Sequence, residues 1–180
     1  MNNNLDLSID FCGLKFKNPF LLSSSPVSNS AEMVARSFDA GWSGVVFKTL
    51  NSDRLPIIHP SPRMHCVHYG SKKEMAVQNV EMISDRPLKD NLTEFLYLKK
   101  NYPDYPIIAS IMGFFTDEWE YLAKASEDNG ADMPELNCSC AHMCIEGAGH
   151  KVGQAFQLLE GFTEVVKKAV SIPVIAKMTP

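Results

Sequence analysis

Hydrophobic positions along this chain follow two alternating patterns, short apolar runs and longer stretches with helical spacing. Short apolar runs bounded by turn residues predict buried strands, whereas apolar positions three and four residues apart predict helices. Strands that alternate with helices indicate an α/β fold with a parallel sheet. The predicted strands are 20–22, 44–49, 106–111, a run ending at 137, and 172–177; the predicted helices are about 30–40, 117–128 and 154–170.

The boundaries of the first predicted helix rest on turn and cap residues. Ser28 or Ser30 can cap its N-terminus, and Gly41 provides a glycine stop after its last turn. We expect its apolar side to include Met33 and Phe38. The helix therefore leads directly into the strand 44–49.

Both patterns fail between about 51 and 88. Three prolines fall between 56 and 62, and three histidines fall between 59 and 68. We predict an irregular loop or insertion at about 51–88 within a single domain, 1–180. Long irregular segments of compact domains often serve as binding loops or lids.

Two architectures fit this alternation, a doubly wound sheet and a (β/α)8 barrel. Polar residues follow the predicted strands at Ser24, Lys48, Asn137 and Lys177, and in both architectures the carboxyl ends of the strands carry the site. The first strand is not followed by G-x-G-x-x-G, which weakens the dinucleotide-binding interpretation. A complete barrel would need three strands beyond the five predicted.

Composition and charge restrict the class of protein. The chain has 180 residues, 45% of them hydrophobic and 21% charged, with a net charge of −4, as expected for a globular domain. Scattered basic residues argue against a nucleic-acid partner or a membrane surface. The N-terminus has no signal-peptide pattern, and no apolar run approaches the ~18 residues of a spanning helix, so we predict a cytoplasmic location.

Three of the five cysteines lie between 138 and 144. With His142, the cysteines Cys138, Cys140 and Cys144 could hold zinc or an iron–sulfur cluster. Their spacing matches no common metal signature, and we predict no metal site. Alternatively, some cysteines are small buried hydrophobic residues; the cysteines in that class are Cys12, Cys66 and Cys138.

Five side chains, at the predicted strand ends and in nearby loops, indicate chemistry. Lys48 alone could be a surface lysine, but with Lys177 at the same place in another unit, two ammonium groups would meet at one rim and attract an anionic or electron-rich ligand. Asn79 and Asn137, unless they are simple turn residues, offer carboxamides that complement a pyrimidine or an amide. Cys140 lies in a glycine-rich polar loop, where a thiol can exchange a proton near neutral pH.

At these residues the sequence resembles the dihydropyrimidine dehydrogenases, and most of all the flavin-bearing subunit of the bacterial NAD-dependent enzymes, within the wider dihydroorotate dehydrogenase family. The resemblance covers nearly the whole chain. Five ordered motifs carry it: 40–49 (AGWSGVVFKT), 78–84 (QNVEMIS), 108–113 (IASIMG), 135–140 (ELNCSC) and 176–180 (AKMTP).

The resemblance implies the N-terminal part of an FMN-binding (β/α)8 TIM barrel, with about five of its eight strands. It implies reversible reduction of uracil or thymine, with Cys140 as the general acid that protonates the base. NAD, FAD and iron–sulfur clusters would belong to other segments or to an NAD/FAD-binding partner subunit. The residues implied to contact FMN are Ser24, Lys48, Thr49 and Lys177, and those implied to line the pyrimidine site are Asn79, Asn137, Cys138 and Ser139.

The sequence departs from the family pattern in two places. Ala141 follows Cys140 where the family usually has proline, and the chain ends at the fifth predicted strand, before the expected phosphate site of FMN. Two alternatives therefore stay open, a dihydroorotate dehydrogenase with a cysteine base and an inactive fragment of an incomplete barrel. Asn79 within QNVEMIS favours the pyrimidine branch, because orotate enzymes generally carry a different, glycine-rich motif there.

Overall fold

The computed structural model describes residues 5–70, 73–140 and 149–178, and its centre is a five-stranded parallel sheet. Its strands are β3 (Leu21–Leu22), β4 (Gly44–Leu50), β7 (Ile107–Ile111), β8 (Met133–Asn137) and β9 (Ile175–Lys177). They lie side by side in the order in which they occur along the chain. A doubly wound sheet reverses its strand order, whereas a barrel does not. The fold is therefore a partial TIM barrel, as predicted.

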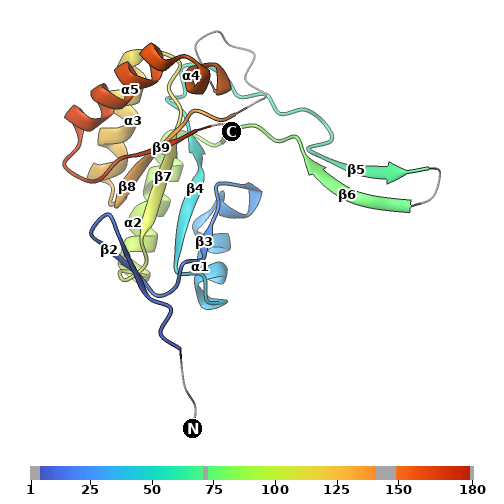
Figure 1. The fold of residues 1–180 in the computed structure, drawn as a ribbon, viewed down its shortest axis with the longest axis horizontal. Coiled ribbons are helices and arrows are strands. Elements are labelled where there is room, and N and C mark those ends of the chain that lie inside the picture. Colours follow the sequence, from blue (N-terminus) through green and yellow to red (C-terminus); the bar gives the residue numbers. More distant parts are fainter. Residues whose placement is uncertain (1–4, 71–72, 141–148, 179–180) are drawn as a thin grey trace.

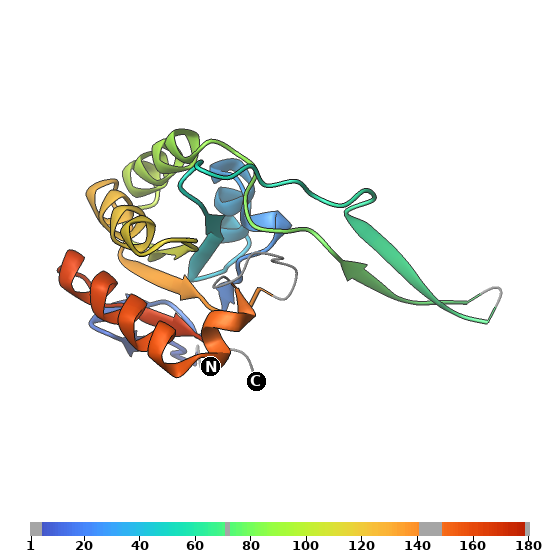
Figure 2. The same cartoon turned by 90° about the horizontal axis from the view of Figure 1, so that it is seen from above.

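Helices connect these strands and lie outside the curved sheet. Seen from above, α1, α2, α3 and α5 follow one another along its convex side (Figure 2). The helical segments are η1 (Pro26–Ser28), α1 (Ala31–Asp39), α2 (Leu88–Asn101), α3 (Thr116–Asp128), α4 (His150–Gln154) and α5 (Phe156–Ala169). Among the described residues, none of these helices is long and apolar enough to cross a bilayer.

Helix α1 shows how local sequence sets the element boundaries. Ser30 caps it by accepting the Met33 N–H, and Gly41 adopts φ 102°, a left-handed conformation that costs glycine little. Val34 and Phe38 are buried against the sheet, whereas Met33 is 45% exposed. The cap and the glycine stop are confirmed, and the predicted burial of Met33 is wrong.

The hydrophobic core has two parts, one on each face of the sheet. The larger part lies between the strands and the outer helices and includes Phe47, Phe95 and Trp119. The smaller part lies on the concave face, where Phe16 of strand β2 (Leu14–Phe16) packs with Ile108 and Met133. Apolar residues thus fill the lower layer of the barrel interior, which leaves the upper layer for polar side chains.

The prediction of an irregular segment at 51–88 was wrong for its middle part. Strands β5 (Met64–Tyr69) and β6 (Lys73–Asn79) pair in an antiparallel hairpin that projects away from the barrel (Figure 1). The described residues of this hairpin are exposed on both faces, so burial imposes no apolar–polar alternation on them. The signal on which the strand prediction depends is therefore missing.

Other elements also differ from the prediction. Helix α2 and the N-terminal hairpin of β1 (Ile9–Phe11) and β2 (Leu14–Phe16) were not predicted. The last predicted helix, about 154–170, is confirmed as α5, but it is preceded by a short helix α4 that was not predicted and that Ala155, with an extended backbone (φ −108°, ψ 95°), separates from α5. Strand β9 begins only at Ile175, because Pro173 lacks the N–H needed for a ladder.

Candidate functional site

A β-bulge near the end of β4 directs two neighbouring polar residues to the same side. In the pairing of β4 with β7, Phe47 lies opposite Ala109 and Leu50 opposite Ile111, so β4 contains one extra residue. Successive side chains of a regular strand point to opposite faces, and a bulge locally removes that alternation. Lys48 and Thr49 consequently line the same cavity, although both are almost fully buried.

This cavity, of about 200 Å³, lies at the carboxyl ends of the parallel strands. Eight of the nine residues predicted for the site line it, and Cys138 does not. Its lining residues are Ser24, Ser25, Lys48, Thr49, Asn79, Glu81, Met82, Ile83, Asn137, Ser139, Cys140 and Lys177. The structure therefore brings together residues that are up to 153 positions apart in the sequence (177 − 24).

The hydroxyl of Thr49 is the centre of a hydrogen-bond network in the wall of the cavity. Asn137 donates its Nδ2–H to Thr49 Oγ1 at 2.9 Å, and the oxygens of Ser110 and Ser24 lie 2.8 and 3.2 Å from the same atom. Thr49, Ser110 and Asn137 are buried. Because their polar atoms are paired with one another, the ends of β3, β4, β7 and β8 are held in a fixed arrangement.

The other side of the Asn137 amide orients the turn after β8. Asn137 Oδ1 accepts the backbone N–H of Ser139 at 3.2 Å and its hydroxyl at 3.0 Å. The two lone pairs of Oδ1 are thereby used, and one of the two Nδ2 protons is donated to Thr49. Among the described residues, the second N–H of Asn137 has no acceptor and remains available to a ligand.

Both lysines of the cavity are paired with carboxylates. Lys48 Nζ lies 2.9 Å from Glu81 Oε2, with both side chains 6% exposed, and Lys177 Nζ lies 2.7 Å from Glu135 Oε1. The prediction of two ammonium groups at one rim is confirmed in position. Their pairing removes most of the net positive charge that such a rim would otherwise have, and Lys48 is not a surface lysine.

Glu81 is the lining residue of greatest chemical interest that the sequence analysis missed. It lies two positions after Asn79, whose Oδ1 accepts the Glu81 N–H at 2.9 Å. Its place inside the motif QNVEMIS was the available signal, but no charge partner could be assigned from sequence. The partner, Lys48, lies 33 residues away in the chain.

The two neighbouring cysteines have different environments. Cys138 is fully buried, and burial raises the pKa of its thiol to about 11, with Lys177 lowering it and Glu135 raising it. Cys140 is only partly buried and lines the cavity. Cys138 therefore stays a neutral thiol in the core, which the structure places outside the predicted pyrimidine site.

The remaining cysteine predictions have mixed outcomes. Cys12 and Cys66 are exposed, so their predicted burial is wrong: Cys12 lies in the turn between β1 and β2, and Cys66 lies on the projecting hairpin. The described residues contain no group of His, Cys, Asp and Glu suited to a metal ion. His142 and Cys144 of the metal alternative, and Ala141, lie outside the described residues.

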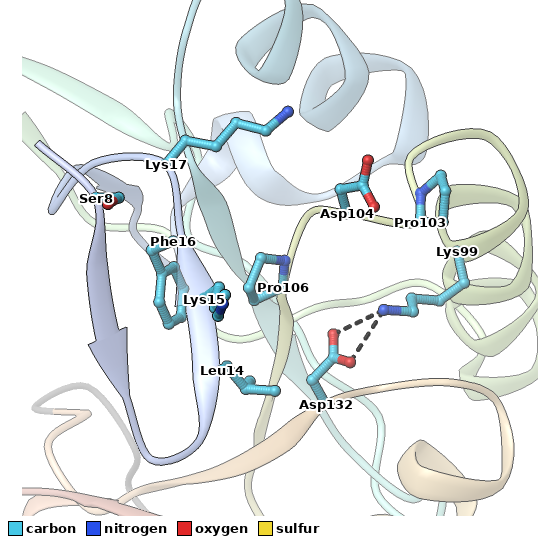
Figure 3. A pocket seen from close by; sticks show the side chains of 10 residues that line it. All are labelled: Ser8, Leu14, Lys15, Phe16, Lys17, Lys99, Pro103, Asp104, Pro106 and Asp132. Carbon is cyan, nitrogen blue, oxygen red and sulfur yellow. Dashed lines mark hydrogen bonds and ion pairs between the residues drawn. The ribbon is translucent and has the colours of Figure 1, made fainter. Parts of the chain in front are cut away.

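A larger cavity, of about 460 Å³, lies at the opposite, amino ends of the strands (Figure 3). Phe16 of the N-terminal hairpin contributes one side, and Asp132 binds Lys99 Nζ at 3.0 and 3.1 Å. Asp132 also accepts the Ile107 N–H at 2.7 Å. These contacts join strand β7 to the loop before β8, a stabilising role typical of that end of a barrel.

Comparison with known proteins agrees with this geometry. Residues 6–180 match the family model described as dihydroorotate dehydrogenase. The chain is 45% identical over 175 residues to the NAD-dependent dihydropyrimidine dehydrogenase subunit PreA of Escherichia coli K12, covering 97% of this chain and 42% of that protein. It is 40% identical over 182 residues to the chloroplastic dihydropyrimidine dehydrogenase (NADP(+)) of Arabidopsis thaliana, covering 97% and 43%.

A third relative represents the orotate branch. The chain is 32% identical over 174 residues to the catalytic subunit of dihydroorotate dehydrogenase B (NAD(+)) of Pyrococcus abyssi, covering 97% of this chain and 54% of that protein. The chain thus spans about half, or less, of the length of the curated relatives it matches. With its family model, its parallel half-barrel and its polar cavity at the carboxyl ends of the strands, the chain belongs to the dihydroorotate dehydrogenase family.

Proposed function

We propose that this chain forms the flavin- and pyrimidine-binding part of an enzyme that reversibly reduces uracil or thymine to the 5,6-dihydropyrimidine. The observation that carries this proposal is that one cavity is lined by Asn79, Glu81, Asn137 and Cys140. The similarity to two dihydropyrimidine dehydrogenases supports the same substrate class.

The residues at the rim fit FMN by their chemistry. Ser24 and Thr49 provide hydroxyl groups, and Lys48 and Lys177 provide ammonium groups, in the same cavity. Such donors match the acceptor atoms of an isoalloxazine ring, and each ammonium group has N–H donors beyond the one that its glutamate accepts. When bound, FMN supplies the hydride that reaches C6 of the pyrimidine.

The hydrogen-bonding capacity left in the cavity matches one edge of uracil. With respect to the residues that the structure describes, Asn137 retains one N–H donor, and Asn79 retains its NH2 group because its contact to Glu81 uses the carbonyl oxygen. Glu81, although paired with Lys48, has lone pairs left to accept an N–H. Two amide donors and a carboxylate acceptor complement the two carbonyl groups and the intervening N–H of the base.

Cys140 is the residue we assign to proton transfer. As the C6–H bond forms, the C5–C6 double bond is lost, and C5 takes the proton from the Cys140 thiol, which becomes a thiolate and is reprotonated from solvent. Cys138 is unsuited to this step, because it is fully buried and its pKa is about 11. Ser139, held by Asn137 Oδ1, fixes the backbone from which Cys140 extends.

The second candidate, a dihydroorotate dehydrogenase with a cysteine base, is supported by the 32% identical orotate relative. Orotate carries a carboxylate, which is bound most strongly where a cation is available. The lysines among the lining residues that the structure describes, Lys48 and Lys177, are both already paired with glutamates. A neutral base fits this arrangement better than an anionic one.

The electron donor and the location also belong to this proposal. The name of the Escherichia coli relative contains both "NAD-dependent" and "subunit", which supports an NAD/FAD-binding partner subunit as the source of electrons. NAD, FAD and iron–sulfur clusters would then be held by that partner or by further segments of the enzyme. A cytoplasmic location stays a prediction.

The experiment that separates the two candidates is a spectral titration of the flavin-loaded protein with uracil and with orotate. The pyrimidine proposal expects uracil to perturb the visible flavin spectrum with saturation, and orotate to do so only at far higher concentration. Saturation by orotate alone would assign the chain to the orotate branch. Failure of the protein to retain any flavin would support the inactive fragment.

A further inference from the structure

Two side chains from the segment before the projecting hairpin hold the segment that follows it. His59 Nδ1 accepts the backbone N–H of Met82 at 3.0 Å. Arg63 donates an N–H from one terminal nitrogen to Glu81 Oε1 at 2.9 Å and an N–H from the other to Asp85 Oδ2 at 2.8 Å. The segment that carries Glu81 over the sheet edge is therefore fixed at three positions, 81, 82 and 85, by residues that do not line the cavity.

We propose that Arg63 is a positioning residue for pyrimidine recognition, acting through the Glu81 carboxylate. This inference rests on the proposed function and deepens it by naming what orients the acceptor for the ring N–H. Arg63 is 49% exposed, whereas the Glu81 side chain is 6% exposed. An exposed cation thus acts on a buried acceptor without touching the ligand.

The division of the Glu81 carboxylate between two cations supports this role. Lys48 binds Oε2 and Arg63 binds Oε1, each at 2.9 Å, so both oxygens are held in place. Two fixed contacts on different oxygens prevent rotation of the carboxylate about its last bond. The free lone pairs are then held in fixed directions, which preorganises the acceptor before a ligand arrives.

The shape of the guanidinium group explains why arginine stands at this position. Glu81 and Asp85 accept hydrogen bonds from the two different terminal nitrogens of the planar Arg63 guanidinium group. A lysine ammonium keeps the charge but lacks this fixed geometry. Without Arg63, Oε1 loses its partner and the carboxylate can turn both oxygens toward Lys48, away from a ligand N–H.

The test compares Arg63→Gln with Arg54→Gln, each in the flavin-loaded protein, by spectral titration with uracil. Arg54 is a matched control because it is 51% exposed and binds the Asp117 carboxylate with two nitrogens, away from the lining residues. Losing one charge-assisted hydrogen bond predicts a rise of about tenfold in the Kd for uracil for Arg63→Gln. We expect Arg54→Gln to match the wild type and Arg63→Lys to recover only part of the affinity.

A second pair of variants separates positioning from a general structural role. If Arg63 acts through Glu81, Arg63→Gln should add no further loss in a Glu81→Gln background, whereas a structural role predicts the same loss in both backgrounds. A ligand-free measurement is hydrogen exchange of peptides covering 79–85, which Arg63→Gln should accelerate.

The outcomes distinguish this inference from the proposed function. Normal uracil affinity in Arg63→Gln, an equal loss in both backgrounds, or unchanged exchange at 79–85 would each overturn the positioning role. A wild-type protein that binds flavin but no uracil would overturn the proposed function. The assignment of a pyrimidine as the ligand of Glu81 would then fail as well. Accelerated exchange together with coupled loss of affinity is the predicted result.

Discussion

Asn137 and Thr49 lie 88 positions apart in the sequence, yet the amide of one donates to the hydroxyl of the other at 2.9 Å in the wall of the cavity. Both residues are buried, and the same hydroxyl lies 2.8 Å from the Ser110 oxygen. Thr49, whose side chain the bulge in β4 directs into the barrel, thus links the polar side chains of the upper layer by hydrogen bonds.

The Thr49→Val variant tests this network. Valine has nearly the shape of threonine, but it leaves the Asn137 amide and the Ser110 hydroxyl without a buried partner. We expect the free energy of unfolding to fall by about 1–3 kcal/mol, measured by urea denaturation. The exposed Thr93→Val, which changes the same atoms on the surface of α2, should stay close to the wild type. Equal stability of both variants would contradict the network.

The Cys140→Ala variant tests the proton donor. Loss of a general acid typically costs about 10²–10⁴-fold in rate, so we expect uracil reduction to slow by that range while the Kd for uracil changes little. The measurement is the single-turnover rate of the flavin-loaded protein. Cys66→Ala, which removes an exposed thiol on the projecting hairpin, controls for thiol loss in general.

Cys138→Ala should give the opposite result. Because Cys138 is fully buried in the core, we expect a loss of stability of about 1 kcal/mol and only a small change in rate. If Cys138→Ala reduced uracil slowly and Cys140→Ala reduced it at the normal rate, Cys138 and not Cys140 would be the proton donor.

His59 should make stability depend on pH. Burial, and then the nearby Arg63, lower the pKa of His59 below its ordinary value of about 6.5, with Asp85 opposing the shift. Between the two pKa values the unfolded chain binds more protons than the folded one, so stability rises with pH. The contribution is present above pH ~6.5 and is lost as pH falls through the lower, folded-state pKa.

The matching variant is His59→Gln, whose side-chain oxygen can still accept the Met82 N–H but does not titrate in this range. We expect the slope of unfolding free energy against pH below 6.5 to be smaller in this variant than in the wild type. The exposed His65→Gln should keep the wild-type slope. An identical slope in all three proteins would refute this role of His59.

Two glycines should respond to alanine with opposite signs. A Cβ at Gly113 would lie 2.9 Å from both the backbone nitrogen and the Cδ1 of Trp119, so Gly113→Ala should destabilise the protein by about 1–3 kcal/mol. A Cβ at Gly161, inside α5, meets nothing within 4 Å, so Gly161→Ala should stabilise by about 0.5–1 kcal/mol. Thermal unfolding of both variants checks the packing between β7 and α3, and the same sign for both would contradict it.

The sequence predicted the parallel sheet because β4 and β7 are continuous apolar runs, which burial on both faces requires. The hairpin of β5 and β6 was missed because exposed strands carry no such pattern. The position of Lys48 at a strand end was evident from sequence, but its pairing with Glu81 was not. Ion pairs depend on the three-dimensional placement of the segment after the hairpin, and local sequence contains no signal for that placement.

Cys138 shows a similar limit. Its neighbours Asn137 and Ser139 take part in the network of the cavity, yet strand alternation directs Cys138 into the core. Motif resemblance assigns the consecutive residues Asn137, Cys138 and Ser139 to one site. In the structure, Asn137 and Ser139 line the cavity, whereas the side chain of Cys138 lies on the other side of the strand, in the core.

The most direct test of the proposed function is anaerobic reoxidation of the reduced flavin by uracil. The flavin-loaded protein is reduced photochemically, mixed with uracil, and followed by the return of the visible absorbance and by the amount of dihydrouracil formed. We predict that the flavin is reoxidised with one dihydrouracil per flavin, and that orotate is far slower. A flavin that stays reduced with uracil but is reoxidised by orotate would contradict the account.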